Sequence, residues 1–241
     1  MTAPFVRRFR HLSTVSGFAG LAVVASCQSR AAVSAGDSNA ADRIADVRRN
    51  DADTRRKIMF VGTSLTAGYG LGEDSAFSVM IQRKIDSAGL PFETVNAGVS
   101  GETPAGLLVR LDGILKAKFN VIVIESGAND GLRGVEANAI KTNLTEVVRR
   151  VKAARPDALI LLVQMEALPN YGRAYGTAFH DLYTSVARES KISLLPFLLE
   201  GVAGRPDLNQ GDGVHPNIRG ERIVAANIWR GLEPVLRESA R

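Results

Sequence analysis

The run Val121-Ile122-Val123-Ile124 constrains the fold of this chain more than any other segment. Four β-branched apolar residues in succession leave no polar face, so a strand built from them must be covered on both sides. Similar short apolar runs recur along the chain and alternate with longer amphipathic stretches. Strands and helices that alternate in this way form a parallel sheet between two layers of helices. We therefore expect a three-layer α/β/α domain.

The same patterns predict five strands and five helices in one domain, residues 55–241, which is long enough to bury one sizeable core. The strands are expected at 57–62, 93–97, 121–125, 159–164 and 193–196. The helices are expected at 74–88, 104–117, 136–154, 173–190 and 217–237.

A serine, a histidine and an aspartate indicate the chemistry. A serine hydroxyl is a poor nucleophile, so it needs a nearby base, and the base needs a third group that fixes its tautomer. Asp212 stands three residues before His215, so one loop can supply two of these groups, and Ser64 follows the first predicted strand in a glycine-containing turn. Outside the N-terminal segment the other histidine is His180, whose place in a predicted helix favours a structural role.

Four short blocks contain these residues in a fixed order. They are Gly62-Thr63-Ser64-Leu65-Thr66-Ala67-Gly68-Tyr69, Asn96-Ala97-Gly98-Val99-Ser100-Gly101-Glu102-Thr103, Ser126-Gly127-Ala128-Asn129-Asp130-Gly131-Leu132-Arg133-Gly134 and Asp212-Gly213-Val214-His215-Pro216. Over residues 56–238 the chain resembles the GDSL or SGNH hydrolase family, in particular its bacterial arylesterase and thioesterase I/lysophospholipase branch.

The resemblance implies a five-stranded parallel sheet of flavodoxin type, with strand order 2-1-3-4-5. It also implies that Ser64 is the nucleophile, that His215 is its base and that Asp212 orients His215. Ligands of such sheets bind beyond the carboxyl ends of the strands, at the point where the strand order reverses. Every block follows a strand or opens the last helix, so we expect all of them at one edge of the sheet.

The resemblance further implies an oxyanion hole formed by the backbone N–H groups of Ser64 and Gly101 and by the side-chain amide of Asn129. Taken alone, each of these residues would fit an ordinary polar turn. One position departs from the family pattern, because Thr63 replaces the aspartate that normally precedes the serine. That aspartate is no member of the triad, so the change concerns hydrogen bonding in the turn. No metal or organic cofactor is expected.

The function that follows is a serine esterase acting on small-molecule or lipid esters or thioesters. A carbohydrate or peptidoglycan O-deacetylase and a silent lipid-binding surface lipoprotein remain alternatives. An α/β-hydrolase would need glycine where Thr66 stands, and a nucleotide-binding module would need a glycine-rich phosphate loop after the first strand. Segments that follow the third and fourth strands are expected to frame the acyl groove, with Leu132, Arg133, Leu168, Pro169 and Tyr171 as candidates.

The N-terminal segment has the pattern of a secretory signal. Three arginines precede an apolar run at about 12–25, which is too short to span a bilayer. The run ends in Val24-Ala25-Ser26-Cys27, which resembles the lipobox of bacterial lipoproteins, and an ordinary signal peptide is the alternative. We expect a signal at 1–26, lipidation of Cys27 and a flexible tether at 27–54, since its polar composition cannot bury enough apolar surface to fold.

These expectations also concern partners and location. Loss of residues 1–26 lowers the formal net charge from +5 to +2, and no basic stripe suggests nucleic acid. A single cysteine excludes an internal disulfide. We expect a monomer. Because Gln28 rather than aspartate follows Cys27, the resemblance to sorted lipoproteins implies the outer membrane of a Gram-negative host. A soluble periplasmic or secreted protein is the alternative.

Overall fold

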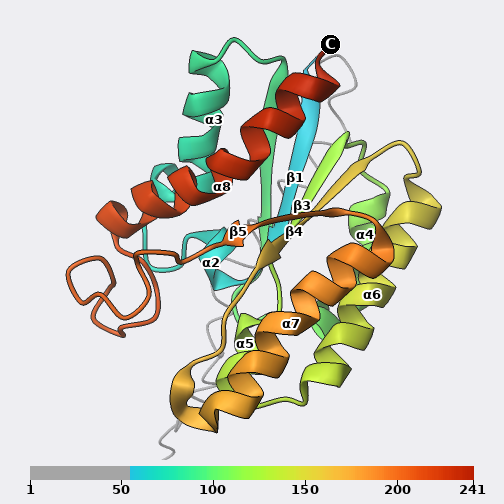
Figure 1. Cartoon of the computed structure of the whole chain (residues 1–241). Helices are drawn as coiled ribbons and strands as arrows, with labels where there is room; N and C mark the ends of the chain where they lie inside the picture. The colour runs from blue at the N-terminus through green and yellow to red at the C-terminus, as the bar shows by residue number, and fades with distance from the viewer. Residues whose placement is uncertain (1–54) are drawn as a thin grey trace, which may run out of the picture. The chain divides into compact units, whose positions relative to one another are not determined.

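The computed structural model describes residues 55–241, and these form a parallel sheet with helices on both faces (Figure 1). The predicted strand order is confirmed as β2-β1-β3-β4-β5. The predicted signal, Cys27 and the tether lie outside the described residues. The strands are β1 (Arg56–Gly62), β2 (Phe92–Gly98), β3 (Val121–Ile124), β4 (Leu159–Gln164) and β5 (Ser193–Phe197).

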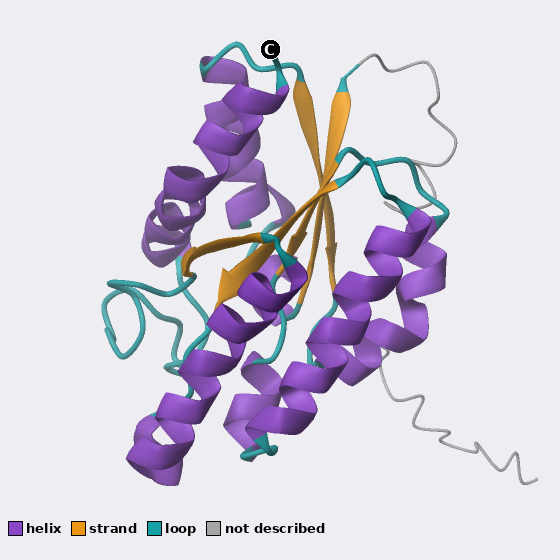
Figure 2. Cartoon of the chain, turned by 45° about the vertical axis from the view of Figure 1, so that its right-hand side comes forward, coloured by secondary structure: helices purple, strands orange, loops and turns teal. Residues whose placement is uncertain are grey.

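Two groups of helices cover the two faces of the sheet (Figure 2). The helices α3 (Phe77–Ser87) and α8 (Ile218–Ser239) contact each other on one face. The other face is covered by α4 (Pro104–Leu115), α6 (Ala137–Ala154) and α7 (Gly172–Ser190). Among the described helices none is long and apolar enough to cross a membrane.

Four short helical segments within residues 55–241 differ from the elements expected from the sequence. They are α2 (Ser64–Ala67), η1 (Glu73–Ser75), α5 (Ala128–Arg133) and η2 (Pro169–Tyr171). The helix predicted at 74–88 is interrupted, because Ala76 has an extended backbone, with φ −64° and ψ 146°, between η1 and α3. The turn expected at Asn129 is the first part of α5.

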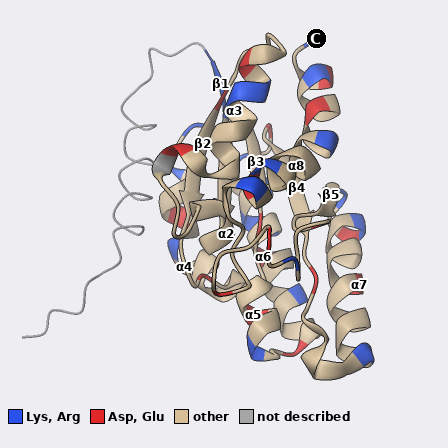
Figure 3. Ribbon diagram, turned by 90° about the vertical axis from the view of Figure 1, so that its left-hand side faces the viewer, with Lys and Arg blue, Asp and Glu red and all other residues tan. Residues whose placement is uncertain are grey.

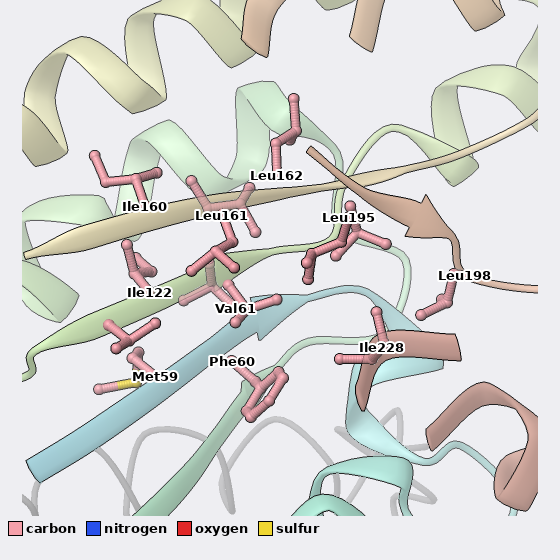
Figure 4. Packing of buried hydrophobic residues seen from close by; sticks show 14 of the residues in the cluster. Met59, Phe60, Val61, Ile122, Ile160, Leu161, Leu162, Leu195, Leu198 and Ile228 are labelled. Atoms are coloured by element: carbon pink, nitrogen blue, oxygen red, sulfur yellow. The ribbon is translucent and has the colours of Figure 1, made fainter. Parts of the chain in front are cut away.

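The core lies on both sides of the central strands, as the unbroken apolar run of β3 required. All four β3 residues are buried, and side chains from β1, β4, β5 and α8 surround them (Figure 4). Phe60 and Ile228 show how the sheet and α8 contribute to the same cluster. Complete burial of one such side chain stabilises the fold by about 1.5–3 kcal/mol relative to an exposed one.

Helix α8 begins and packs for reasons visible in its sequence. Asn217 caps its first turn by accepting hydrogen bonds from the N–H groups of Arg219 and Gly220. Apolar residues four apart, such as Val224 and Ile228, are buried against the sheet. Residues of both charge signs occur along α7 and α8 (Figure 3).

A buried carboxyl group joins α8 to α3. No side chain of α3's own N-cap, Ala76, accepts a hydrogen bond from its first turn, but the carboxyl group of Glu221 accepts one from the N–H of Phe77. Glu221 is only 2% exposed, and burial raises its pKa to about 8. An acidic group at a helix N-terminus satisfies free N–H groups there, so Glu221 acts as a cap supplied by another helix.

We expect Glu221→Gln to change how stability depends on pH. Because the pKa of Glu221 is raised on folding, the folded state binds more protons than the unfolded state between the ordinary glutamate pKa of 4.5 and about 8. The free energy of unfolding of the wild type therefore loses this contribution as pH rises through that interval. Glutamine keeps the acceptor and cannot ionise, so the variant should lose this part of the pH dependence. Urea denaturation of 55–241 at several pH values would test this, and parallel curves for the two proteins would contradict it.

Candidate active site

A tight turn at the end of β1 places Ser64 at the carboxyl edge of the sheet. The side chain of Thr63 caps α2, accepting a hydrogen bond from the N–H of Leu65, so the helix begins directly after the strand. A Cβ at Gly62 would come within 2.1 Å of the hydroxyl oxygen of Thr66. Only glycine therefore allows this close approach between the strand end and α2, which leaves Ser64 half-buried.

The structure brings together Ser64, His215 and Asp212, although 151 residues separate the first two. His215 Nε2 lies 2.8 Å from Ser64 Oγ, and His215 Nδ1 lies 2.7 Å from Asp212 Oδ2. The other carboxylate oxygen of Asp212 accepts hydrogen bonds from the N–H groups of Val214 and His215, at 2.9 and 3.0 Å. The three-residue spacing thus lets one carboxylate both shape the loop and bind the ring of its histidine.

The same hydrogen bonds keep Asp212 ionised. They lower its pKa from 3.8 to about 2, with the N–H of His215 the largest cause, followed by the N–H of Val214 and the side chain of His215. A carboxylate that accepts several N–H groups strongly favours its charged form. Asp212 therefore carries its negative charge throughout the neutral range.

Two residues for which the sequence predicted no role, Gln210 and Tyr69, contact the His215 loop. The N–H of Gln210 donates to the carbonyl of His215 at 2.7 Å, and its side-chain amide donates to the carbonyls of Tyr69 and Pro216 at 2.7 and 3.0 Å. The ring of Tyr69 lies 4.8 Å from the ring of His215, centroid to centroid. Gln210 thus links the loop of the histidine to the segment that follows the serine.

The candidate oxyanion groups Gly101 and Asn129 lie on neighbouring segments. Gly101 has φ +78°, which favours glycine. The amide of Asn129 donates one hydrogen bond, 2.9 Å long, to the carbonyl of Glu102. Since that amide carries two N–H groups, the bond orients it and leaves the second N–H for another acceptor.

An ion pair that the sequence analysis missed supports this turn. Arg110 donates from Nη2 to the Glu102 carboxylate at 2.7 Å and to the carbonyl of Ala97 at 2.8 Å. Glu102 is 8% exposed, so the pair is largely shielded from solvent. Arg110 thereby ties the turn after Gly101 to the end of β2. Glu102 lies in the second of the four sequence blocks, but Arg110 lies eight positions further on, outside every block, so no sequence signal predicted the pair.

The residues predicted for the substrate groove lie on exposed segments that follow β3 and β4. Tyr171 donates a hydrogen bond from its hydroxyl to the carbonyl of Leu132 at 3.1 Å, so these two segments are in contact. Leu132, Leu168 and Tyr171 are 40%, 49% and 43% exposed, and Arg133 is exposed too. Pro169 lines a cavity of about 470 Å³ beside α7, whose lining includes neither Ser64 nor His215.

The second histidine lies apart from the triad residues. His180 is exposed on α7, and its Nδ1 lies 2.7 Å from the carboxylate of Glu166. Within residues 55–241 no group of three or more histidine, cysteine or acidic residues is arranged to hold a metal ion.

Known proteins are similar to this chain in both sequence and fold. The model of the GDSL-like Lipase/Acylhydrolase family matches residues 60–223. "Esterase TesA" of Pseudomonas aeruginosa is 37% identical over 180 residues, which cover 74% of this chain and 89% of that protein. "Thioesterase 1/protease 1/lysophospholipase L1" of Escherichia coli K12 is 34% identical over 186 residues, covering 77% and 86%.

A solved structure extends the likeness to three dimensions. The crystal structure of the psychrotrophic esterase EstA from Pseudoalteromonas superposes with a TM-score of 0.71 at 33% identity, covering 76% of this chain and 99% of that one. The family model spans most of the described domain, and the sheet order is the one that the resemblance implied. This chain belongs to the GDSL-like lipase/acylhydrolase family of ester hydrolases.

Proposed function

We propose that this protein is a serine esterase that hydrolyses acyl esters or thioesters through an acyl-enzyme. The observation that carries the proposal is the continuous hydrogen-bonded series from Ser64 Oγ through His215 to Asp212. Similar proteins named as an esterase, a thioesterase/lysophospholipase and an arylesterase support this class of substrate.

In the proposed reaction Ser64 Oγ attacks the acyl carbon while His215 Nε2 takes its proton. The ionised Asp212 stabilises the imidazolium that forms. His215 then returns the proton to the departing alcohol or thiol, leaving the acyl group on Ser64. Water attacks this acyl-enzyme with the same base, and Ser64 is regenerated.

Negative charge develops on the carbonyl oxygen in each addition step and needs fixed donors. We assign this role to the N–H groups of Ser64 and Gly101 and to the second amide hydrogen of Asn129. The bond from Asn129 to Glu102 holds the amide before substrate binds, so little reorganisation is needed at the moment of reaction.

The exposed apolar side chains around Leu132, Leu168 and Tyr171 suit the acyl part of a substrate. We further propose that the protein is exported, lipidated at Cys27, anchored on the outer membrane and monomeric. Support for the anchor is the lipobox-like sequence at 24–27, preceded by a signal-like segment.

The first test concerns the nucleophile. A fluorophosphonate should label wild-type protein at Ser64, in keeping with the inhibition of EstA by monoethylphosphonate, and Ser64→Ala should abolish labelling and ester hydrolysis. Mass spectrometry locates the label, and circular dichroism checks the fold of the variant. An ester series of increasing acyl length should favour longer chains, whereas activity confined to acetylated sugars would indicate the O-deacetylase. Folded Ser64→Ala with wild-type turnover would refute the nucleophile assignment.

A second test separates the orienting residue from the oxyanion donor. Asp212→Asn keeps an oxygen for the N–H groups of Val214 and His215 but removes the charge beside Nδ1, so kcat should fall about 10⁴-fold. Asn129→Ala should lower kcat by about 10²–10³ with little change in KM, because its donor acts mainly in the transition state. Steady-state kinetics measure both. Near-wild-type turnover of Asp212→Asn would refute its role.

A third test concerns the anchor. Full-length protein produced in a Gram-negative host should fractionate with membranes and carry acyl chains on an N-terminal Cys27. Cys27→Ser should prevent acylation and release the esterase from the membrane fraction, with kcat of the domain unchanged. Intact-mass measurement is the readout. A mature N-terminus well downstream of residue 27 would contradict the lipobox interpretation.

A further inference from the structure

Glu125 lies directly behind the nucleophile turn. It follows β3, is 1% exposed and pairs through its own N–H with the carbonyl of Val61 at the end of β1. A Cβ on Gly62 would lie only 2.6 Å from its carboxylate. The side chain of Glu125 thus occupies the space between the ends of the two strands, where the chain turns into α2.

Three donors from this turn converge on one oxygen of Glu125. The N–H of Thr63, the hydroxyl of Thr63 and the hydroxyl of Thr66 lie 2.8, 3.0 and 2.8 Å from Oε2. Thr63 precedes Ser64 and Thr66 follows it by two residues. The carboxylate therefore holds the turn on both sides of Ser64 without touching Ser64 itself.

The same residue connects both halves of the proposed oxyanion hole. Only two residues separate Glu125 from the start of α5, which carries Asn129. Hydrogen bonds from the Ser64 turn to Glu125 therefore fix the N–H of Ser64 relative to the segment of Asn129. A displacement of about 1 Å between groups that act together can lower a rate 10²-fold.

Because residue 63 is threonine, the carboxyl group of Glu125 binds this turn with no second carboxyl group at position 63. Its hydroxyl lies 3.1 and 3.0 Å from the two oxygens of Glu125. The aspartate expected at this position in the family would bring a second carboxyl group to the same buried place. Two such groups cannot both ionise, so one would have to keep a proton.

We propose that Glu125 is a positioning residue of the ester hydrolase. It holds the turn from Thr63 to Thr66 so that the hydroxyl and the N–H of Ser64 face the substrate together. Because residue 63 is threonine, Glu125 has no second carboxyl group beside it with which it would share a proton. This proposal rests on the proposed role of Ser64. Burial raises the pKa of Glu125, and the hydrogen bonds from Thr63 and Thr66 oppose that effect.

The first experiment compares variants of the buried carboxyl group. Glu125→Ala should lower kcat and the rate of fluorophosphonate labelling about tenfold to 10²-fold with KM nearly unchanged, since the substrate groove is intact. Glu125→Gln keeps an acceptor oxygen and should restore most of the rate. Glu221 is also a buried glutamate, but it contacts α3. Glu221→Gln therefore serves as the matched control and should keep the wild-type kcat.

The second experiment measures kcat as a function of pH. A purely structural role of Glu125 would leave this pH dependence unchanged. Thr63→Asp should be active while the two carboxyl groups share a proton, and its kcat should fall as rising pH removes that proton. Thr63→Asp/Glu125→Gln should lack this alkaline loss, and Thr63→Ser should keep the wild-type profile. This comparison decides the question even if Glu125→Ala fails to fold.

The proposal is overturned if folded Glu125→Ala retains wild-type kcat, or if Thr63→Asp has the wild-type pH profile. Ser64→Ala is measured alongside. If Ser64→Ala is inactive while Glu125→Ala is fully active, only the positioning role of Glu125 is refuted. If Ser64→Ala is active, the proposed function itself is refuted.

Discussion

Parallel pairing of β1 with β3 is the interaction on which the site depends. Val61 pairs with Ile124, so both strands end at the same level. The residues that follow them, the Ser64 turn and the segment leading to Asn129, therefore begin side by side. Burial of the apolar side chains on both faces of β3 stabilises this pairing. Core packing thus determines the geometry of the edge that carries Ser64 and Asn129.

The carboxyl groups of Asp212, Glu102, Glu125 and Glu221 show how differently one chemical group behaves in different surroundings. Asp212 is exposed and receives two backbone N–H groups, which lowers its pKa. Glu125 and Glu221 are buried, and desolvation raises the pKa of each. Glu102 is paired with Arg110. Asp212 binds the proposed base, while Glu125 and Glu221 each accept a hydrogen bond from a backbone N–H group of another segment. Charge is therefore present at the histidine, where an imidazolium would form.

Supporting residues connect these parts into one unit. Gln210 links the His215 loop to the segment after Ser64, and Arg110 links the Gly101 turn to β2. Each side chain donates to backbone carbonyls and so holds a loop in place, and Arg110 also pairs with the carboxylate of Glu102. Loops held in this way can present reacting groups with little reorganisation. The long segment between β5 and α8 can thus carry a histidine whose position depends on distant contacts.

The sequence by itself determined the fold class, all five strands to within one residue at each end, and the residues of the proposed triad. Periodic burial and chemical type are local properties, which is why runs such as Val121–Ile124 and the spacing of Asp212 and His215 could be interpreted directly. Only the tertiary structure decided that Glu125 would face the Ser64 turn, that Gln210 would reach Tyr69 and that Ala76 would interrupt a predicted helix. The first two contacts join residues 62 and 141 positions apart, and contacts between such distant residues leave no periodic pattern in a single sequence. The interruption at Ala76 lies where α3 receives its cap from Glu221 of α8, a contact made only when the helices pack together.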